Sequence, residues 1–215
     1  MKKIVVLISG NGSNLQAIID NCNSGNINGE IACVISNRED VYGIERAKTS
    51  KIKTKIINED AFQSRAHFDE GLFNLLLDIN ADLIVLAGFM KILDEKTANY
   101  FFGKIINIHP SLLPKYPGLN THKKVIENKE KYHGVSVHYV SSQLDAGPLI
   151  AQGQIKVNKD ENTENLKERI HKVEHIIYPE VIKLICDNKI YLNHGKTVNL
   201  YTNDTKGFMH NSYEI

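Results

Sequence analysis

The sequence predicts an α/β protein built on a doubly wound, mostly parallel sheet. In its first half, near-continuous apolar runs alternate with segments of helical spacing, and a glycine-rich turn follows the first run. Such runs are typical of strands buried on both faces, and strands that alternate with helices form βαβ units. The second half shows apolar and polar residues in strict alternation, which predicts antiparallel strands at the edge of the sheet.

The first half contains five expected strands, at residues 3–8, 31–35, 53–57, 83–87 and 104–108. Apolar residues at helical spacing predict the helices between them, at residues 15–20, 42–50 and 61–78, with one more before the fifth strand. The second half contains two alternating segments and a long helix, at residues 135–140, 150–157 and 163–187. We expect Thr163 to cap that helix and Pro179 to kink or interrupt it.

Length and composition are typical of a soluble globular protein, with 215 residues, 42% apolar and 24% charged. We expect one domain over residues 1–195 and a polar, loosely ordered tail over residues 196–215. The net charge of +1 gives no reason to expect a nucleic-acid partner, and no apolar segment is long enough to expect a membrane partner. Three widely spaced cysteines indicate a reducing compartment, so we predict a cytoplasmic protein.

The proline-rich segment at residues 107–118 is the most informative part of the sequence. It follows an apolar strand and crowds three prolines and a glycine into twelve residues, so the chain must leave the sheet on a stiff path. Asn107 and His109 lie two apart on extended backbone, so their side chains point to the same side. A histidine after a strand is often structural. An amide and an imidazole held together can instead stabilise a carbonyl oxygen that gains negative charge, and we expect a catalytic role.

The turn Gly10-Asn-Gly12-Ser13-Asn14 joins the first strand to the first helix. Its glycines and the helix N-terminus would suit a phosphate group. The turn is neither a full G-x-G-x-x-G motif nor a P-loop. The alternative is a tight turn in which Ser13 or Asn14 only caps the helix.

Three further segments carry candidate residues. In the turn Leu144-Asp145-Ala-Gly-Pro, Asp145 could pair with His109 and favour its protonated form, although Asp-x-Gly turns are common. Residues 87–93 could line a pocket for a flat heterocycle or pack in the core. We expect His138, on an alternating strand, to pack or to form a hydrogen bond.

His171-Lys-Val-Glu174-His175 matches the H-x-x-E-H pattern of some zinc peptidases. Two histidines at i and i+4 share one helix face, as metal ligands must. Short patterns of this kind arise easily by chance, and only Glu180 follows nearby as a third ligand. We therefore expect no metal site, and Glu174 could instead bind a cationic amine.

With these residues in place, the chain resembles the folate-dependent formyltransferases over roughly residues 1–195. The matching segments are Val-Val-Leu-Ile-Ser-Gly-Asn-Gly-Ser-Asn-Leu-Gln-Ala-Ile, Leu-Ala-Gly-Phe-Met-Lys-Ile-Leu, Asn-Ile-His-Pro-Ser-Leu-Leu-Pro, Leu-Asp-Ala-Gly-Pro and Glu174-His175 with Tyr178-Pro179. The Gly-Asn-Gly-Ser-Asn turn is similar to the branch of the family that acts on glycinamide ribonucleotide. The chain departs from some relatives at Asn120, where a histidine often stands, and at His171, where some have lysine.

The resemblance implies a Rossmann-like formyltransferase fold, with ribonucleotide phosphate bound by residues 1–103, and catalysis and folate binding in residues 104–195. It implies a formyl transfer in purine biosynthesis, from 10-formyltetrahydrofolate as co-substrate to the amine of a ribonucleotide, with both partners small molecules and no metal. The implied catalytic residues are Asn107, His109 and Asp145. The implied ribonucleotide contacts are Gly12, Ser13, Asn14, Asn107 and Glu174. The implied folate contacts are Arg65, Met90, Lys91, Ile92 and Leu93.

Other functions compete with this one. A formyltetrahydrofolate hydrolase would carry an extra N-terminal domain, whereas this chain enters its first strand at Lys3. A formyltransferase acting on tRNA would be longer and more basic. A non-catalytic nucleotide-binding module would not need the Asn107 and His109 pair.

Overall fold

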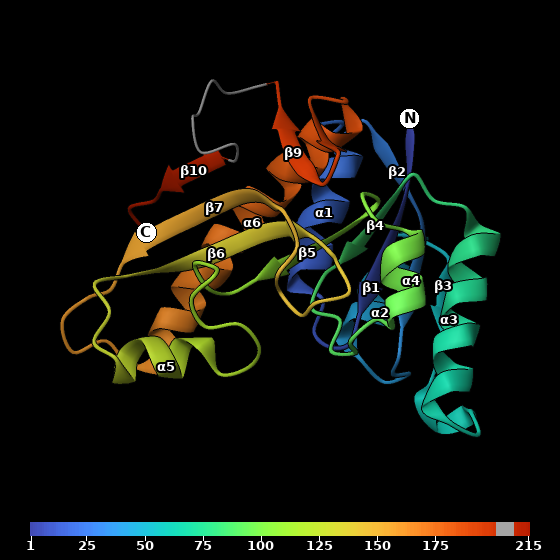
Figure 1. Ribbon diagram of the computed structural model, residues 1–215, viewed down its shortest axis with the longest axis horizontal. Helices are drawn as coiled ribbons and strands as arrows, with labels where there is room; N and C mark the ends of the chain where they lie inside the picture. Colours follow the sequence, from blue (N-terminus) through green and yellow to red (C-terminus); the bar gives the residue numbers. More distant parts are fainter. Residues whose placement is uncertain (201–208) are drawn as a thin grey trace. The chain divides into compact units, whose positions relative to one another are not determined.

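The computed structural model of the chain describes residues 1–200 and 209–215. These residues divide into two compact units, Met1–Ile106 and Asn107–Ile215. Each unit is built from strands and helices that lie close together in the sequence (Figure 1).

Four strands of the first unit run parallel to one another: β1 (Lys2–Ile8), β2 (Gly29–Ser36), β3 (Thr54–Ile56) and β4 (Leu83–Leu86). β1 pairs with β2 on one side and with β4 on the other, and β2 pairs with β3. The five apolar residues that end β1 are fully buried, as expected for a strand covered on both faces. The carboxyl ends of these four strands lead into turns at the edge where open α/β sheets place their ligands.

The helices of the first unit are α1 (Ser13–Asn23), α2 (Tyr42–Thr49), α3 (Arg65–Ile79) and α4 (Glu95–Tyr100), with a short 3-10 turn, η1 (Glu59–Ala61). α3 begins later than its apolar spacing predicts. The reason is Ser64, whose side chain accepts a hydrogen bond from the His67 backbone N–H and so caps the helix there.

The second unit begins inside β5 (Ile105–His109), with Asn107 as its first residue. It continues through α5 (Thr121–Glu127), β6 (Tyr132–Tyr139), β7 (Leu149–Lys156) and α6 (Thr163–Cys186). β6 and β7 pair in antiparallel register, as predicted for the second half. α6 packs against both strands with a buried apolar face (Figure 1).

One expectation for α6 is wrong, that of its N-cap. Its N-cap is Asn162, not Thr163, because the Asn162 side chain accepts from the Asn165 N–H. Pro179 does not interrupt the helix, which continues to Cys186. A proline costs an interior helix about 3 kcal/mol. Burial of the helix on both sides of Pro179, at Tyr178 and Val181, offsets that cost.

The described part of the polar tail is more ordered than expected. β8 (Ile190–Asn193) and β9 (Lys196–Asn199) form a hairpin whose two turn residues, His194 and Gly195, both have positive φ. This is the backbone of a type I′ turn, which matches the twist of two-residue hairpins. β10 (Met209–Ser212) then pairs in parallel with β7. Strand pairing uses backbone groups, so polar side chains do not prevent it.

Hydrogen bonds order the main strands as β10-β7-β6-β5-β4-β1-β2-β3, with β8 and β9 in a separate pair. The predicted α/β fold with a mostly parallel sheet and an antiparallel pair in the second half is therefore confirmed. Within the described residues, no helix combines the length and apolarity needed to cross a membrane.

Candidate active site

β5 carries Asn107 and His109, the two residues that the sequence predicts to be catalytic. Ile106 and Ile108 are buried, and the alternation of the strand places Asn107 and His109 on its other side. His109 is 6% exposed and Asn107 is half-buried. The strand then ends in the proline-rich segment, whose Tyr116 and Gly118 both return to this site.

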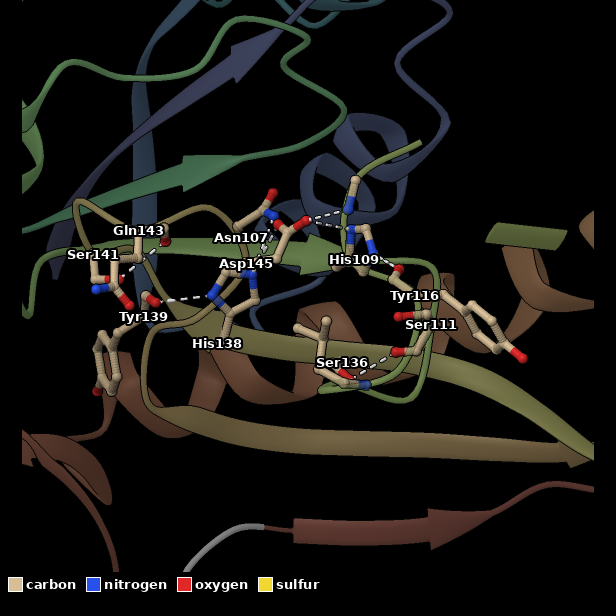
Figure 2. A network of polar contacts seen from close by, with 12 residues as sticks. Asn107, His109, Ser111, Tyr116, Ser136, His138, Tyr139, Ser141, Gln143 and Asp145 are labelled. Carbon is tan, nitrogen blue, oxygen red and sulfur yellow. Dashed lines mark hydrogen bonds and ion pairs between the residues drawn. The ribbon is translucent and has the colours of Figure 1, made fainter. Parts of the chain in front are cut away.

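Both ring nitrogens of His109 face oxygen atoms (Figure 2). Nε2 lies 2.9 Å from the backbone carbonyl oxygen of Tyr116, and Nδ1 lies 3.4 Å from Asp145 Oδ2. A carbonyl oxygen can only accept a hydrogen bond, so Nε2 carries a hydrogen. The other ring nitrogen, Nδ1, faces Asp145, so His109 and Asp145 form the pair that the sequence suggested.

The turn after β6 fixes Asp145. Its Oδ2 accepts a hydrogen bond of 2.8 Å from the Gly118 backbone N–H, and its backbone has a φ of +50°. Gly147 closes the turn so tightly that a Cβ there would lie 1.8 Å from the Tyr139 carbonyl oxygen. The Asp-x-Gly spacing therefore places the carboxylate beside His109, and its glycine is a steric requirement.

His138 is a site residue whose role the sequence did not reveal. Its Nδ1 lies 2.8 Å from the Tyr139 carbonyl oxygen, and its Nε2 lies 3.3 Å from Asn107 Nδ2. Burial lowers the pKa of His138, although the Tyr139 carbonyl and Asp145 act in the opposite direction. The neutral ring therefore holds its hydrogen on Nδ1 and accepts from Asn107. This leaves the second Nδ2 hydrogen of Asn107 for another acceptor.

The turn between β1 and α1 has the features of an anion site. Gly12 is the N-cap residue of α1 with a φ of +74°, and as a glycine it provides no side-chain cap for the first helical N–H groups. A Cβ on Gly12 would lie 2.7 Å from the Gly43 Cα atom, so the close approach of α2 requires glycine. Ser13 and Asn14 are the first two helical residues, where backbone N–H groups and the helix dipole favour a phosphate.

Arg46 shapes this turn from α2. Its Nε and Nη2 donate to the backbone oxygen and the side-chain oxygen of Asn11, at 3.0 and 3.2 Å, and its Nη1 donates to Gln16 Oε1 at 3.2 Å. Arg46 lies 35 positions from Asn11 and belongs to no motif, so its role could not be predicted from the sequence.

Residues 88–93 form a turn after β4 that is fixed from inside. The Met90 N–H donates to Ser9 Oγ at 2.8 Å, and Ser9 Oγ donates to Asn37 Oδ1 at 2.6 Å. Ser9 and Asn37 are both buried, whereas the Met90 side chain is 68% exposed. The turn thus presents a flexible apolar side chain outward on a rigid base.

The charged folate candidates lie close together in the first unit. Lys91 forms an ion pair with Glu59, and Arg65 forms one with Asp69 at 2.8 Å. Arg65 also donates to the Ile92 backbone oxygen, which ties α3 to the 88–93 turn. The hydrogen bond from Lys91 lowers the pKa of Glu59. Ile92 is exposed and Leu93 is buried.

Glu174 lies on α6 and is 5% exposed. Burial raises the pKa of Tyr178, and the nearby charge of Glu174 raises it further. The rings of His171 and His175 are stacked with centroids 6.3 Å apart. No group of three histidine, cysteine or acidic side chains suited to a metal occurs among residues 1–200 and 209–215.

The structure thus brings Asn107, His109 and Asp145 together in the second unit and adds His138 and the Tyr116 carbonyl. The first unit separately carries the α1 turn and the 88–93 turn with Arg65. A fixed amide, an imidazole and a carboxylate can activate and stabilise an acyl centre during group transfer.

Comparison with known proteins defines the class. Residues 2–182 match the family model described as formyl transferase. The chain belongs to this family of enzymes, which confirms the resemblance found in the sequence.

Individual relatives narrow the comparison. The chain is 45% identical over 190 residues to phosphoribosylglycinamide formyltransferase of Escherichia coli (strain K12), covering 88% of this chain and 90% of the relative. It is 45% identical over 192 residues to the Haemophilus influenzae enzyme of the same name, covering 89% and 91%. A solved structure of phosphoribosylglycinamide formyltransferase from Coxiella burnetii superposes with a TM-score of 0.91 at 45% identity, covering 97% and 98%.

Proposed function

We propose that this chain transfers the formyl group of 10-formyltetrahydrofolate to the amine of 5′-phosphoribosylglycinamide, giving N-formylglycinamide ribonucleotide in purine biosynthesis. The observation that carries the proposal is the cluster of Asn107, His109 and Asp145, in which two hydrogen-bond donors lie beside a carboxylate. The names of the relatives support the choice of acceptor. The choice of 10-formyltetrahydrofolate as donor rests on the resemblance of the sequence to folate-dependent formyltransferases.

In the first step, the lone pair of the glycinamide amine attacks the formyl carbon. A C–N bond forms, and the C=O π electrons move to the oxygen, which becomes an oxyanion. The second Nδ2 hydrogen of Asn107 and the Nδ1 hydrogen of protonated His109 are the donors for that oxyanion, since their other hydrogens are committed to His138 and Tyr116. Such donors supply a large share of the rate in acyl transfer.

In the second step, the oxyanion collapses and the bond between the formyl carbon and N10 breaks. The bonding electrons go to N10, which takes up one proton, and the former amine gives up one. Asp145 positions a water that carries this proton between the two nitrogens, so that no net proton is gained or lost. The route requires no covalent enzyme intermediate.

We assign binding roles by chemistry. The backbone of Gly12, Ser13 and Asn14 would hold the phosphate, and the Glu174 carboxylate would hold the glycinamide end of the substrate. Arg65 and Lys91 carry positive charge suited to the folate carboxylates, with Met90, Ile92 and Leu93 offering apolar contact. The substrates are small molecules, and the three free cysteines suit the cytoplasm.

A spectroscopic assay of folate deformylation, run with and without 5′-phosphoribosylglycinamide, tests the proposal. We expect the signal to depend on the ribonucleotide and the formylated ribonucleotide to accumulate in equal amount. Deformylation at the same rate without the amine would instead indicate hydrolysis of formyltetrahydrofolate.

A further inference from the structure

Two polar side chains, Ser136 and Gln152, lie buried on the neighbouring strands β6 and β7. They are direct partners in the antiparallel register and are 0% and 7% exposed. Burying a hydroxyl or an amide costs free energy unless it forms hydrogen bonds, so this pair needs a physical account.

The two side chains hold the proline-rich segment through its backbone. Ser136 Oγ donates to the Ser111 carbonyl oxygen at 2.7 Å and accepts from the Leu113 N–H at 3.0 Å. Gln152 Nε2 donates to the Leu113 carbonyl oxygen at 2.8 Å and to Ser136 Oγ at 2.9 Å. Three backbone groups of a segment that does not pair as a strand thus form hydrogen bonds with side chains of β6 and β7. Figure 2 shows the contact between Ser136 and Ser111.

The anchored segment leads directly to His109. Ser111 Oγ donates to the Lys115 carbonyl oxygen at 2.6 Å, which fixes the chain one residue before Tyr116. Tyr116 has a φ of +55°, an unusual backbone conformation for a residue with a side chain. Its carbonyl oxygen accepts from His109 Nε2 at 2.9 Å.

We propose that Ser136 and Gln152 are positioning residues for the formyl transfer. By holding residues 111–115, they place the Tyr116 carbonyl where it keeps a hydrogen on His109 Nε2. This hydrogen bond also orients the ring so that Nδ1 faces Asp145. Nδ1 is then the nitrogen that takes up the second proton and donates it as a hydrogen bond to the reacting oxygen. The catalytic part of this inference rests on the proposed function, whereas the effect on the His109 ring does not.

A purely structural role predicts a different outcome. Two buried hydrogen-bonding groups could serve only to stabilise the fold, in which case their loss would lower the free energy of unfolding and leave the His109 ring unchanged. The ring hydrogens therefore distinguish the two roles. The 15N chemical shifts of the two ring nitrogens report which of them carries hydrogen, with His109 assigned by its absence in His109→Gln.

The test uses Gln152→Met, which keeps the side-chain length but removes both hydrogen bonds, and Ser136→Ala. The matched control is Gln154→Met on the same strand, because Gln154 donates to Ser212 and not to the proline-rich segment. We expect both test variants to lower kcat by roughly ten- to a hundredfold, the cost of a small misplacement of a catalytic group. We expect little change in KM, and 15N shifts that show a mixture of the Nδ1–H and Nε2–H tautomers in neutral His109, instead of the Nε2–H tautomer alone.

Ser136→Thr restores the hydroxyl and should recover most of kcat. If Ser136→Ala or Gln152→Met does not fold, Gln152→Asn, with its amide drawn back from Leu113, carries the test. Folded variants with wild-type kcat and wild-type His109 shifts would overturn the inference. If the wild-type chain shows no formyl transfer, the proposed function fails while the 15N measurement still decides the positioning role.

Discussion

At the scale of single residues, fixed hydrogen-bond acceptors decide what the catalytic candidates can donate. The Tyr116 carbonyl holds a hydrogen on His109 Nε2, and His138 takes one of the two Nδ2 hydrogens of Asn107. Asn107 is therefore left with one donor hydrogen, and His109 would add a second, on Nδ1, in the protonated form that the proposed mechanism uses. Donors that are held in place stabilise an oxyanion better than mobile groups do, because they need no reorganisation when the negative charge develops.

This arrangement predicts the effect of removing either donor. We expect Asn107→Ala and His109→Ala each to lower kcat by roughly two to three orders of magnitude, the usual loss for one oxyanion-hole donor. The fold should remain intact, as checked by circular dichroism. Near-normal turnover of His109→Ala in the formyl-transfer assay would contradict the catalytic assignment.

Ser9 allows a second prediction at this scale. Ser9→Ala leaves the Met90 N–H and Asn37 Oδ1 without the partner that the hydroxyl provided. An unsatisfied buried group costs about 1–3 kcal/mol, so the urea midpoint should fall. The loosened 88–93 turn should raise KM for 10-formyltetrahydrofolate more than KM for the ribonucleotide.

The control for Ser9→Ala is Ser24→Ala, which removes an exposed hydroxyl bonded to the Asn21 carbonyl oxygen. We expect this variant to change neither KM nor the midpoint appreciably. Equal KM values for folate in Ser9→Ala and the wild type would show that the 88–93 turn does not depend on Ser9.

The site residues that could be predicted from the sequence are those whose placement depends on strand periodicity or on a turn motif. The period of a strand puts Asn107 and His109 on one side, and the Asp-x-Gly turn provides Asp145. It could not assign His138 or the Tyr116 carbonyl, because their roles depend on which strand lies next to β5 and on one left-handed residue. The catalytic roles themselves remain predictions.

At the scale of elements, apolar periodicity located the strands and helices, and tertiary packing set their ends. α6 continues through Pro179 because its buried face is long. The hairpin of β8 and β9 was not predicted because each of its strands is only four residues long. The close packing of α1 and α2 was equally invisible in the sequence, since it depends on the contact between Gly12 and Gly43.

That contact makes Gly12→Ala informative. The φ of +74° and the 2.7 Å approach to Gly43 Cα mean that a methyl group must displace the turn. We expect a clear rise in KM for the ribonucleotide, because the N–H groups of Ser13 and Asn14 move relative to the phosphate.

Gly25→Ala is the matched control, since Gly25 has a φ of +76° with nothing within 4 Å of a Cβ. Both variants should lose about 1–2 kcal/mol in urea unfolding from backbone strain. Only Gly12→Ala should change KM. An unchanged KM in that variant would remove the phosphate role from this turn.

At the scale of the whole molecule, the buried His133 and the half-buried His122 link stability to pH. His122 Nδ1 and His133 Nε2 lie 2.9 Å apart, so one ring must donate and the other must accept. Burial lowers the pKa of His122 to about 4, helped by the charges of His171, Lys167 and His109.

Burial also lowers the pKa of His133 to about 3, with contributions from His122 and His109, while Glu130 acts in the opposite direction. Both rings are therefore neutral in the folded chain under ordinary conditions.

The direction of the pH effect follows from proton linkage. Above pH 6.5, the ordinary histidine value, both rings are neutral in the folded and unfolded chain and contribute no pH dependence. Below pH 6.5, the unfolded chain binds protons that the folded chain does not, so the free energy of unfolding falls. The loss from His122 continues to about pH 4 and that from His133 to about pH 3.

We therefore expect the urea midpoint of the wild type to fall steadily between pH 7 and pH 4.5. His133→Gln, which cannot take up a proton, should start lower at pH 7 because the contact with His122 is altered, but should fall less steeply. His67→Gln changes an exposed histidine on α3 and should keep the wild-type slope. Parallel curves for His133→Gln and the wild type would mean that acid acts on the fold through other groups.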